Sequence, residues 1–125
     1  GRYFFDLGTQ GKLTGSSVST DITSSNYTPS SGNQNLQLTI DGVLSGTIQI
    51  TGGPYNSTNS MASALETAIN ADNILAQNDI SVDVDYLSNK YIITSKKYGS
   101  NSSVLINSID NGLNNYLGIQ FEFQH

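Results

Sequence analysis

Two aspartates are the residues of this sequence best placed to do chemistry. Asp83 and Asp85 lie two positions apart in an alternating apolar and polar stretch, so a strand there would place both carboxylates on one face. Carboxylates paired in this way can bind calcium or act in acid–base catalysis. The same alternation is typical of the solvent side of a half-buried strand, and the sequence has no D-x-[DN]-x-[DN]-G calcium loop. We therefore expect Asp83 and Asp85 to be exposed strand residues.

The sequence lacks the residues that usually activate a nucleophilic serine or act as a thiol nucleophile. Serine is abundant, but the single histidine is His125, the last residue of the sequence. Cysteine is absent, which removes disulfides, thiol nucleophiles and thiolate metal sites. No G-x-S-x-G, phosphate-loop or G-x-G-x-x-G pattern is present. The sequence therefore predicts a non-enzymatic protein that has no catalytic, cofactor-binding or metal-binding residues and uses no cofactor.

The low density of charge argues against nucleic acid as a partner. Only 12% of the residues are charged, against about 25% in an average globular domain, and the net charge is −5. The five basic residues are scattered, with Lys96 and Lys97 as the one adjacent pair, whereas phosphate binding needs clustered Lys and Arg. No apolar run approaches the roughly 20 residues of a membrane span. We expect neither a nucleic-acid partner nor membrane association.

Tyrosine content leaves carbohydrate open as a partner. Three N-x-[ST] sequons begin at Asn26, Asn56 and Asn101, although a chain this rich in Asn, Ser and Thr produces several by chance. Exposed tyrosines beside Ser, Thr and Asn can form carbohydrate-binding surfaces. Alternatively, Tyr86 and Tyr91 form a cross-strand pair within a sheet. A carbohydrate-binding module would show a shallow exposed groove lined by Tyr with Asn or Asp.

The length fits a single domain over residues 1–125, because a chain of this size buries roughly two thirds of its unfolded surface around one core. We interpret this domain as a piece of a larger subunit. A strand is predicted over residues 3–7 and another over 119–123, both from alternating apolar residues. Residues 8–35 are dense in Gly, Ser and Thr and are predicted as a flexible loop region that Val18 and Ile22 anchor.

Residues 36–51 are predicted as a hairpin with two alternative registers. A two-residue Asp41–Gly42 turn is the strongest local signal, but it would send the apolar residues of the two strands to opposite faces. A three-residue loop over 44–46 would pair Val43 with Thr47 and gather four apolar residues on one face, namely Leu38, Ile40, Ile48 and Ile50. Since a one-residue slip turns every side chain over, we favour the second register.

A helix follows, which Asn59 or Ser60 is expected to cap. Helical spacing joins a stripe of apolar residues that would cover one face of a sheet: Met61, Leu65, Ala68, Ile69 and Leu75. We predict core packing for this stripe.

The clearest hairpin spans residues 80–97, where a Ser88–Asn89 turn pairs Tyr86 with Tyr91 and Val84 with Ile93. A short strand over 104–106 and a helical turn begun by Asp110 complete the order, and the packing residues of that turn are Leu113, Tyr116 and Leu117. The predicted fold is α+β, mostly antiparallel sheet with one main helix packed on a face and a short helical turn near the C-terminus.

Six pieces of the chain carry a family resemblance by their order and spacing. They are "LTIDG" (38–42), "LETAIN" (65–70), "ISVDVDY" (80–86), "KYIITS" (90–95), "GSNSSVLI" (99–106) and "NYLGI" (115–119). Residues 36–119 resemble the flagellin hook IN motif, a unit of flagellins, filament cap proteins and hook-associated proteins. Within it, Ile69 is expected to face the sheet, and Asn70 to serve the helix C-terminus or bond neighbouring loop backbone.

The resemblance implies a structural, surface-exposed domain of a bacterial flagellar filament, cap or hook-associated protein. It further implies an extracellular location, contacts with neighbouring copies of the same or related subunits, and possible glycans on Ser or Thr. An inserted domain needs its ends close together, so the strands over 3–7 and 119–123 are expected to lie side by side. The alternative is a carbohydrate-binding or structural domain of a phage tail or adhesin.

Overall fold

The computed structural model describes residues 9–119, which form two antiparallel sheets and three helices. The strands are β1 (Gln10–Thr14), β2 (Asn35–Ile40), β3 (Val43–Leu44), β4 (Ile48–Gln49), β5 (Val82–Leu87), β6 (Lys90–Tyr98) and β7 (Val104–Ile109). The helices are α1 (Thr58–Asn70), α2 (Asn73–Gln77) and α3 (Asn111–Leu117). The strand predicted over 3–7, the end of the strand predicted over 119–123 and their expected pairing lie outside the described residues.

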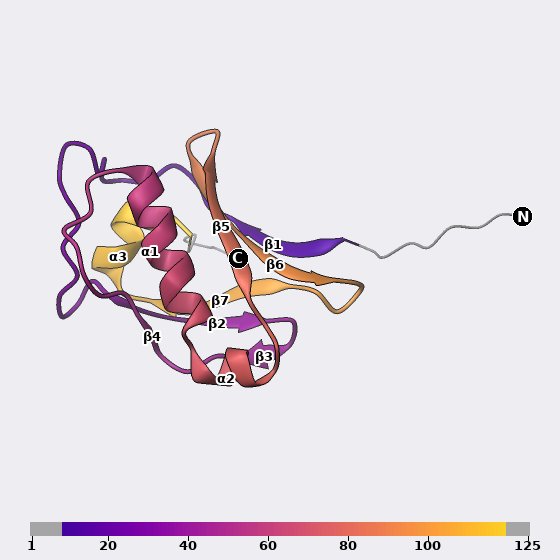
Figure 1. The fold of residues 1–125 in the computed structure, drawn as a ribbon. Helices are drawn as coiled ribbons and strands as arrows, with labels where there is room; N and C mark the ends of the chain where they lie inside the picture. Colours follow the sequence, from indigo (N-terminus) through magenta and orange to yellow (C-terminus); the bar gives the residue numbers. More distant parts are fainter. Residues whose placement is uncertain (1–8, 120–125) are drawn as a thin grey trace, which may run out of the picture.

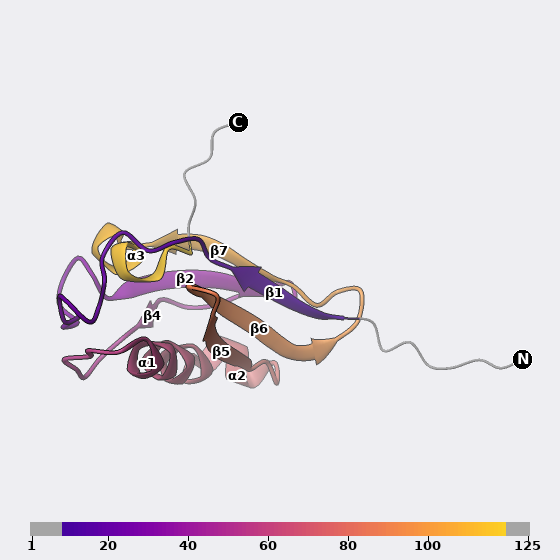
Figure 2. The same cartoon turned by 90° about the horizontal axis from the view of Figure 1, so that it is seen from above.

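The two sheets and the helices build layers (Figures 1 and 2). One sheet has the strand order β1-β6-β5. In the other, β3 and β4 follow each other along one edge of β2, and β7 pairs with its opposite edge. Viewed from above, α1 and α2 form one layer and α3 lies on the opposite side, near β7 (Figure 2). This arrangement confirms the predicted α+β fold dominated by antiparallel sheet.

The favoured register of the first hairpin is wrong. The turn is Asp41–Gly42, which pairs Ile40 with Val43, and both turn residues have positive φ angles of 53° and 83°. Two-residue hairpin turns with positive φ match the twist of the strands they join, and Asp and Gly tolerate that conformation. The conformational preference of the turn residues therefore determined the strand pairing next to the turn. The distribution of apolar residues between the two faces did not.

A β-bulge reconciles this turn with the apolar pattern. Beyond Leu44 the register shifts by one residue, so that Leu36 pairs with Ile48 and both are buried. Ser45 fills the shift: its N–H donates to Leu38 O (2.8 Å), and its buried hydroxyl accepts from Leu38 N–H (3.1 Å). The extra residue turns the later part of the strand over, as bulges do. Ile48 and Ile50 thus reach the core face despite the two-residue turn.

Helix α1 begins earlier than predicted, and a different residue forms its N-cap. Its N-cap is Ser57, whose hydroxyl accepts from Ser60 N–H (3.0 Å), while Ser60 Oγ accepts from Ser57 N–H (3.2 Å). The prediction of Asn59 or Ser60 as the cap is therefore wrong, because Ser60 instead completes a reciprocal capping box from inside the first turn. Core packing of the stripe is confirmed for Met61, Leu65 and Ile69, which are fully buried. Leu75 is buried too, but it belongs to the separate helix α2.

The second hairpin agrees with its prediction. Tyr86 pairs with Tyr91 and Val84 with Ile93, around a Ser88–Asn89 turn whose residues have φ angles of 53° and 67°. Alternation and turn residues agree in this segment, so the register was determined locally. Helix α3 starts after Asp110, as predicted, and Gly118 ends it in the left-handed conformation (φ 60°).

The predicted loop over residues 8–35 is wrong at residues 10–14, which form β1. This strand pairs antiparallel with β6 and sets Leu13 opposite Ile93. An edge strand needs mainly its backbone to join a ladder, so the sequence signal there was weak. The following stretch is anchored: Ile22 is buried as expected, and Tyr27 is completely buried.

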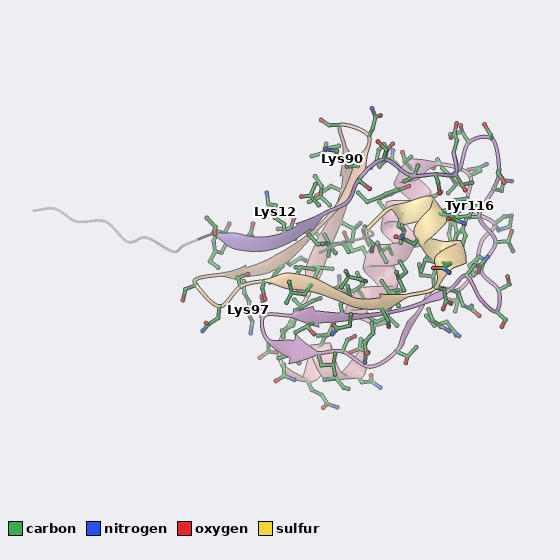
Figure 3. The ribbon with its side chains drawn as sticks, turned by 180° about the vertical axis from the view of Figure 1, so that it is seen from behind. Lys12, Lys90, Lys97 and Tyr116 are labelled. Atoms are coloured by element: carbon green, nitrogen blue, oxygen red, sulfur yellow. The ribbon has the colours of Figure 1, made fainter. Side chains whose placement is uncertain are left out.

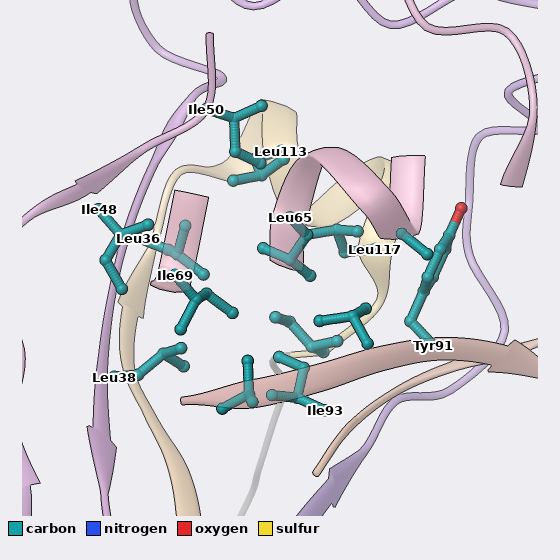
Figure 4. Packing of buried hydrophobic residues seen from close by; sticks show 14 of the residues in the cluster. Leu36, Leu38, Ile48, Ile50, Leu65, Ile69, Tyr91, Ile93, Leu113 and Leu117 are labelled. Carbon is teal, nitrogen blue, oxygen red and sulfur yellow. The ribbon is translucent and has the colours of Figure 1, made fainter. Parts of the chain in front are cut away.

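The core lies between α1 and the sheets and receives residues from nearly every element. Figure 4 shows Leu65 and Ile69 of α1 among Leu36, Leu38 and Ile93, with Leu113 and Leu117 of α3 joining from the far side. The apolar stripe of the main helix and the alternating faces of β2 and β6 are thus one cluster. Burial of this set is the main stabilising term of the fold.

Replacing Tyr27 by phenylalanine is expected to lower the free energy of unfolding by about 1–2 kcal/mol. The Tyr27 hydroxyl donates to Asn33 O (2.7 Å), and removing it leaves that carbonyl without this bond while the ring stays packed on Tyr55. Urea unfolding followed by circular dichroism measures the change. Tyr98→Phe is the control, because Tyr98 is 56% exposed and should change stability very little. Equal effects of the two variants would contradict the anchoring role.

Candidate functional site

The paired aspartates lie on the solvent side of their strand. Asp83 and Asp85 are exposed on β5, as predicted, and Asp83 lies 3.7 Å from the Lys96 ammonium. In residues 9–119 no three His, Cys, Asp or Glu side chains gather in a way that could hold a metal ion. The best sequence candidates for acid–base or calcium chemistry are therefore solvated strand residues.

Asn70 of "LETAIN" links the main helix to a sheet edge. Its amide Nδ2 donates to Val82 O (3.0 Å), and its Oδ1 accepts from Val82 N–H (2.8 Å). One turn earlier, Glu66 Oε1 accepts from Val84 N–H (2.8 Å). Strand β5 is the outer strand of its sheet, so these side chains satisfy the backbone groups that an edge strand leaves unpaired. Asn70 bonds a strand, where loop backbone or the helix end was expected.

Asp41 of "LTIDG" plays a similar part between the two sheets. Its carboxylate accepts from the Ser95 hydroxyl of β6 (2.8 Å) and from Ser103 N–H just before β7 (3.1 Å). Its own N–H donates to Ser103 O (2.9 Å). One turn residue thus ties three strands together.

Aromatic side chains line a hollow that we call the tyrosine cleft, which is defined by Tyr86, Tyr91, Tyr116, Asp21, Thr23 and Asn89. It has a volume of about 320 Å³ and lies where the tip of the β5–β6 hairpin meets residues 18–23 and α3. The Tyr86 and Tyr91 rings contact each other at a centroid distance of 4.7 Å and an angle of 59°. This confirms the predicted cross-strand pair and places it at the cleft.

Hydrogen bonds and burial fix the polar groups of the cleft. Tyr116 donates its hydroxyl to Asn26 O (3.1 Å). Asp21 Oδ1 accepts from the hydroxyl (2.7 Å) and the N–H (2.9 Å) of Thr23, and these bonds hold the pKa of Asp21 below its usual range. Burial raises the pKa of Tyr91, so its phenol stays protonated and can donate a hydrogen bond.

A larger open groove, of about 720 Å³, runs between α1 and residues 47–55. Its walls are mostly hydroxyl-bearing and small side chains. Its single carboxylate, Asp72, already accepts from Gly46 N–H and Leu75 N–H (both 3.1 Å). The polar groups with defined geometry in this groove therefore serve the fold, and the tyrosine cleft is the better candidate for binding.

The basic residues of the described chain form no single patch. Figure 3 shows Lys12, Lys90 and Lys97 apart from one another, with Tyr116 at a distance from all three. None of the helices within residues 9–119 has the length and apolar character that crossing a membrane requires.

Sequence reasoning found only part of the cleft. The pairing of Tyr86 with Tyr91 followed from the hairpin, but Tyr116 was predicted only as a packing residue of the last helical turn, and Asp21 had no signal at all. These residues are far apart along the chain, and only the docking of α3 and residues 18–23 beside the hairpin brings them together.

Fold and site thus define an α+β domain with a tyrosine-lined cleft and with motif residues that hold its elements together. Comparison with known proteins finds no matching family model, no matching curated protein and no matching solved structure.

Proposed function

We propose that this chain is a non-enzymatic structural domain displayed on the outside of a bacterial flagellar filament, cap or hook-associated protein. Its partners are neighbouring copies of the same or related subunits, its location is extracellular, and its surface serines and threonines are possible glycan attachment sites. The proposal starts from the ordered motif pieces over residues 36–119.

One observation carries the structural part of the proposal. Two polar residues of the motif pieces make bonds inside the domain: Asn70 holds α1 to β5, and Asp41 holds the β2–β3 turn to β6 and to the residue before β7. Residues that serve a reaction or a ligand would point into an open site. The motif side chains therefore stabilise the domain itself. This favours a structural role in an assembly over an enzymatic role.

Immunogold electron microscopy tests the location. Antibodies raised against the purified chain are applied to intact flagellated cells that produce the protein. Labelling along the filament, at its tip or at the hook junction is expected, and the position distinguishes a filament subunit from a cap or junction protein. Mass spectrometry of the sheared flagella then reports whether Ser or Thr carries added sugar mass.

Cells without flagella are the control and should carry no label. Gold confined to phage particles would overturn the flagellar proposal and favour the alternative, a phage tail or adhesin domain. Gold confined to the cell interior would overturn both.

A further inference from the structure

We propose that the tyrosine cleft binds one uncharged monosaccharide unit of a glycan. The inference depends on the cleft alone and holds whether the domain belongs to a flagellum or to another surface assembly. Three features of the cleft support it: a tyrosine hydroxyl that opens to the cleft and has no protein partner, fixed aromatic rings, and a rim of hydrogen-bonding groups without positive charge.

The first feature is the hydroxyl of Tyr91, a residue whose ring is almost completely buried. The residue is only 1% exposed, yet its hydroxyl forms no hydrogen bond with any atom of residues 9–119. Among the described residues, Asn35 Oδ1 is the one side-chain nitrogen or oxygen that is both fully enclosed and without a hydrogen-bond partner. The Tyr91 oxygen also lacks a partner, so it is not fully enclosed. Figure 4 shows the Tyr91 hydroxyl directed away from Leu65 and Ile93. The hydroxyl oxygen therefore reaches the solvent of the cleft, where a polar ligand atom can replace water as its hydrogen-bond partner.

The aromatic walls come from three elements and are held in place. Tyr86 of β5 packs on Tyr91 of β6, and Tyr116 of α3 packs on Tyr27 at a centroid distance of 5.1 Å. An aromatic ring offers an apolar face with a polar tip. A pyranose ring has a matching C–H face and hydroxyls around its edge, so it can lie against tyrosine while its hydroxyls reach polar groups.

The rim favours an uncharged ligand with many hydroxyls. Asp21 is the one charged residue among the described residues that line the cleft, and its carboxylate is held in position by Thr23. The Asp21 carboxylate repels a phosphate or sulfate, and the lining contains no lysine or arginine to offset that repulsion. Carboxylate, amide and hydroxyl groups instead suit sugar hydroxyls, which both donate and accept. The volume of about 320 Å³ is at the small end of ligand sites and fits a single ring.

Nuclear magnetic resonance titration of the full chain tests the proposal. The probes are the methyl glycosides of glucose, galactose, mannose and N-acetylglucosamine, added singly to isotopically labelled protein, and a glycan array extends the panel. At least one sugar is expected to bind with a Kd on the order of 1 mM and to shift the amide signals of Asp21, Asn89 and Tyr91.

Two variants locate the binding. Tyr91→Phe keeps the ring and removes only the hydroxyl, so affinity should fall about fivefold while the remaining spectrum stays folded. Tyr98→Phe, on an exposed tyrosine outside the cleft, should leave affinity unchanged. Absence of binding by every sugar, unchanged affinity in Tyr91→Phe, or binding of a proline-rich peptide in place of sugars would overturn the proposal.

Discussion

Replacing Asp41 by alanine is expected to lower the free energy of unfolding by about 3–4 kcal/mol. The change removes the carboxylate that accepts from the Ser95 hydroxyl and from Ser103 N–H, and Ser95 is completely buried. Hydrogen bonds to a charged group are each worth about 1.5–3 kcal/mol. Alanine also occupies the left-handed conformation (φ 53°) less readily than aspartate does. Urea unfolding, monitored by circular dichroism, measures the loss.

Asp79→Ala is the matched control for this prediction. Asp79 has nearly the same backbone conformation (φ 59°), but it is exposed and its side chain makes no hydrogen bond within the described residues. Its replacement should cost about 1 kcal/mol, which is the backbone contribution alone. If the two variants lost the same stability, the bonds from Asp41 to Ser95 and Ser103 would contribute nothing to the free energy of unfolding.

Asn70→Ala is expected to destabilise the domain by about 2–4 kcal/mol. The variant leaves the N–H and C=O of Val82 without their side-chain partners, and Val82 is fully buried beneath α1. A buried backbone group left unsatisfied costs about 1–3 kcal/mol. Chemical denaturation gives the size of the effect, and hydrogen exchange at Val82 N–H gives its location, since opening of the β5 edge should expose that amide first.

Two further substitutions separate the edge contact from general effects on the helix. Asn59→Ala changes an exposed residue of the same helix and should alter stability by less than about 0.5 kcal/mol. Asn70→Asp keeps an acceptor for Val82 N–H but cannot donate to Val82 O, so it should be less stable than the parent protein. A stable Asn70→Asp variant would show that only the accepted bond matters.

The parts of the fold that the sequence predicted well are those in which local signals agree. Around Ser88–Asn89 the turn residues, the alternation and the aromatic pair all favour one register, and the structure has it. The stripe through Met61, Leu65 and Ile69 has one consistent helical spacing, so its burial followed directly.

The predictions failed where two local signals disagreed or where both were weak. At Asp41–Gly42 the turn and the apolar pattern favoured different registers, and the bulge at Ser45 satisfied both in a way that neither signal indicates. At β1, a strand with one apolar residue depends on the ladder that β6 offers. Pairing partners of this kind are distant in sequence and leave no local pattern.

The sequence by itself determined the class of fold, the second hairpin, the main helix and the exposure of Asp83 and Asp85, because periodicity and turn chemistry act over a few residues. Only the tertiary structure decided what Asn70 and Asp41 bond, and which residues join Tyr86 and Tyr91 in a cleft. These outcomes depend on backbone groups left open at strand edges and on the docking of α3 and residues 18–23. Contacts between segments so far apart along the chain are fixed only when the whole core packs.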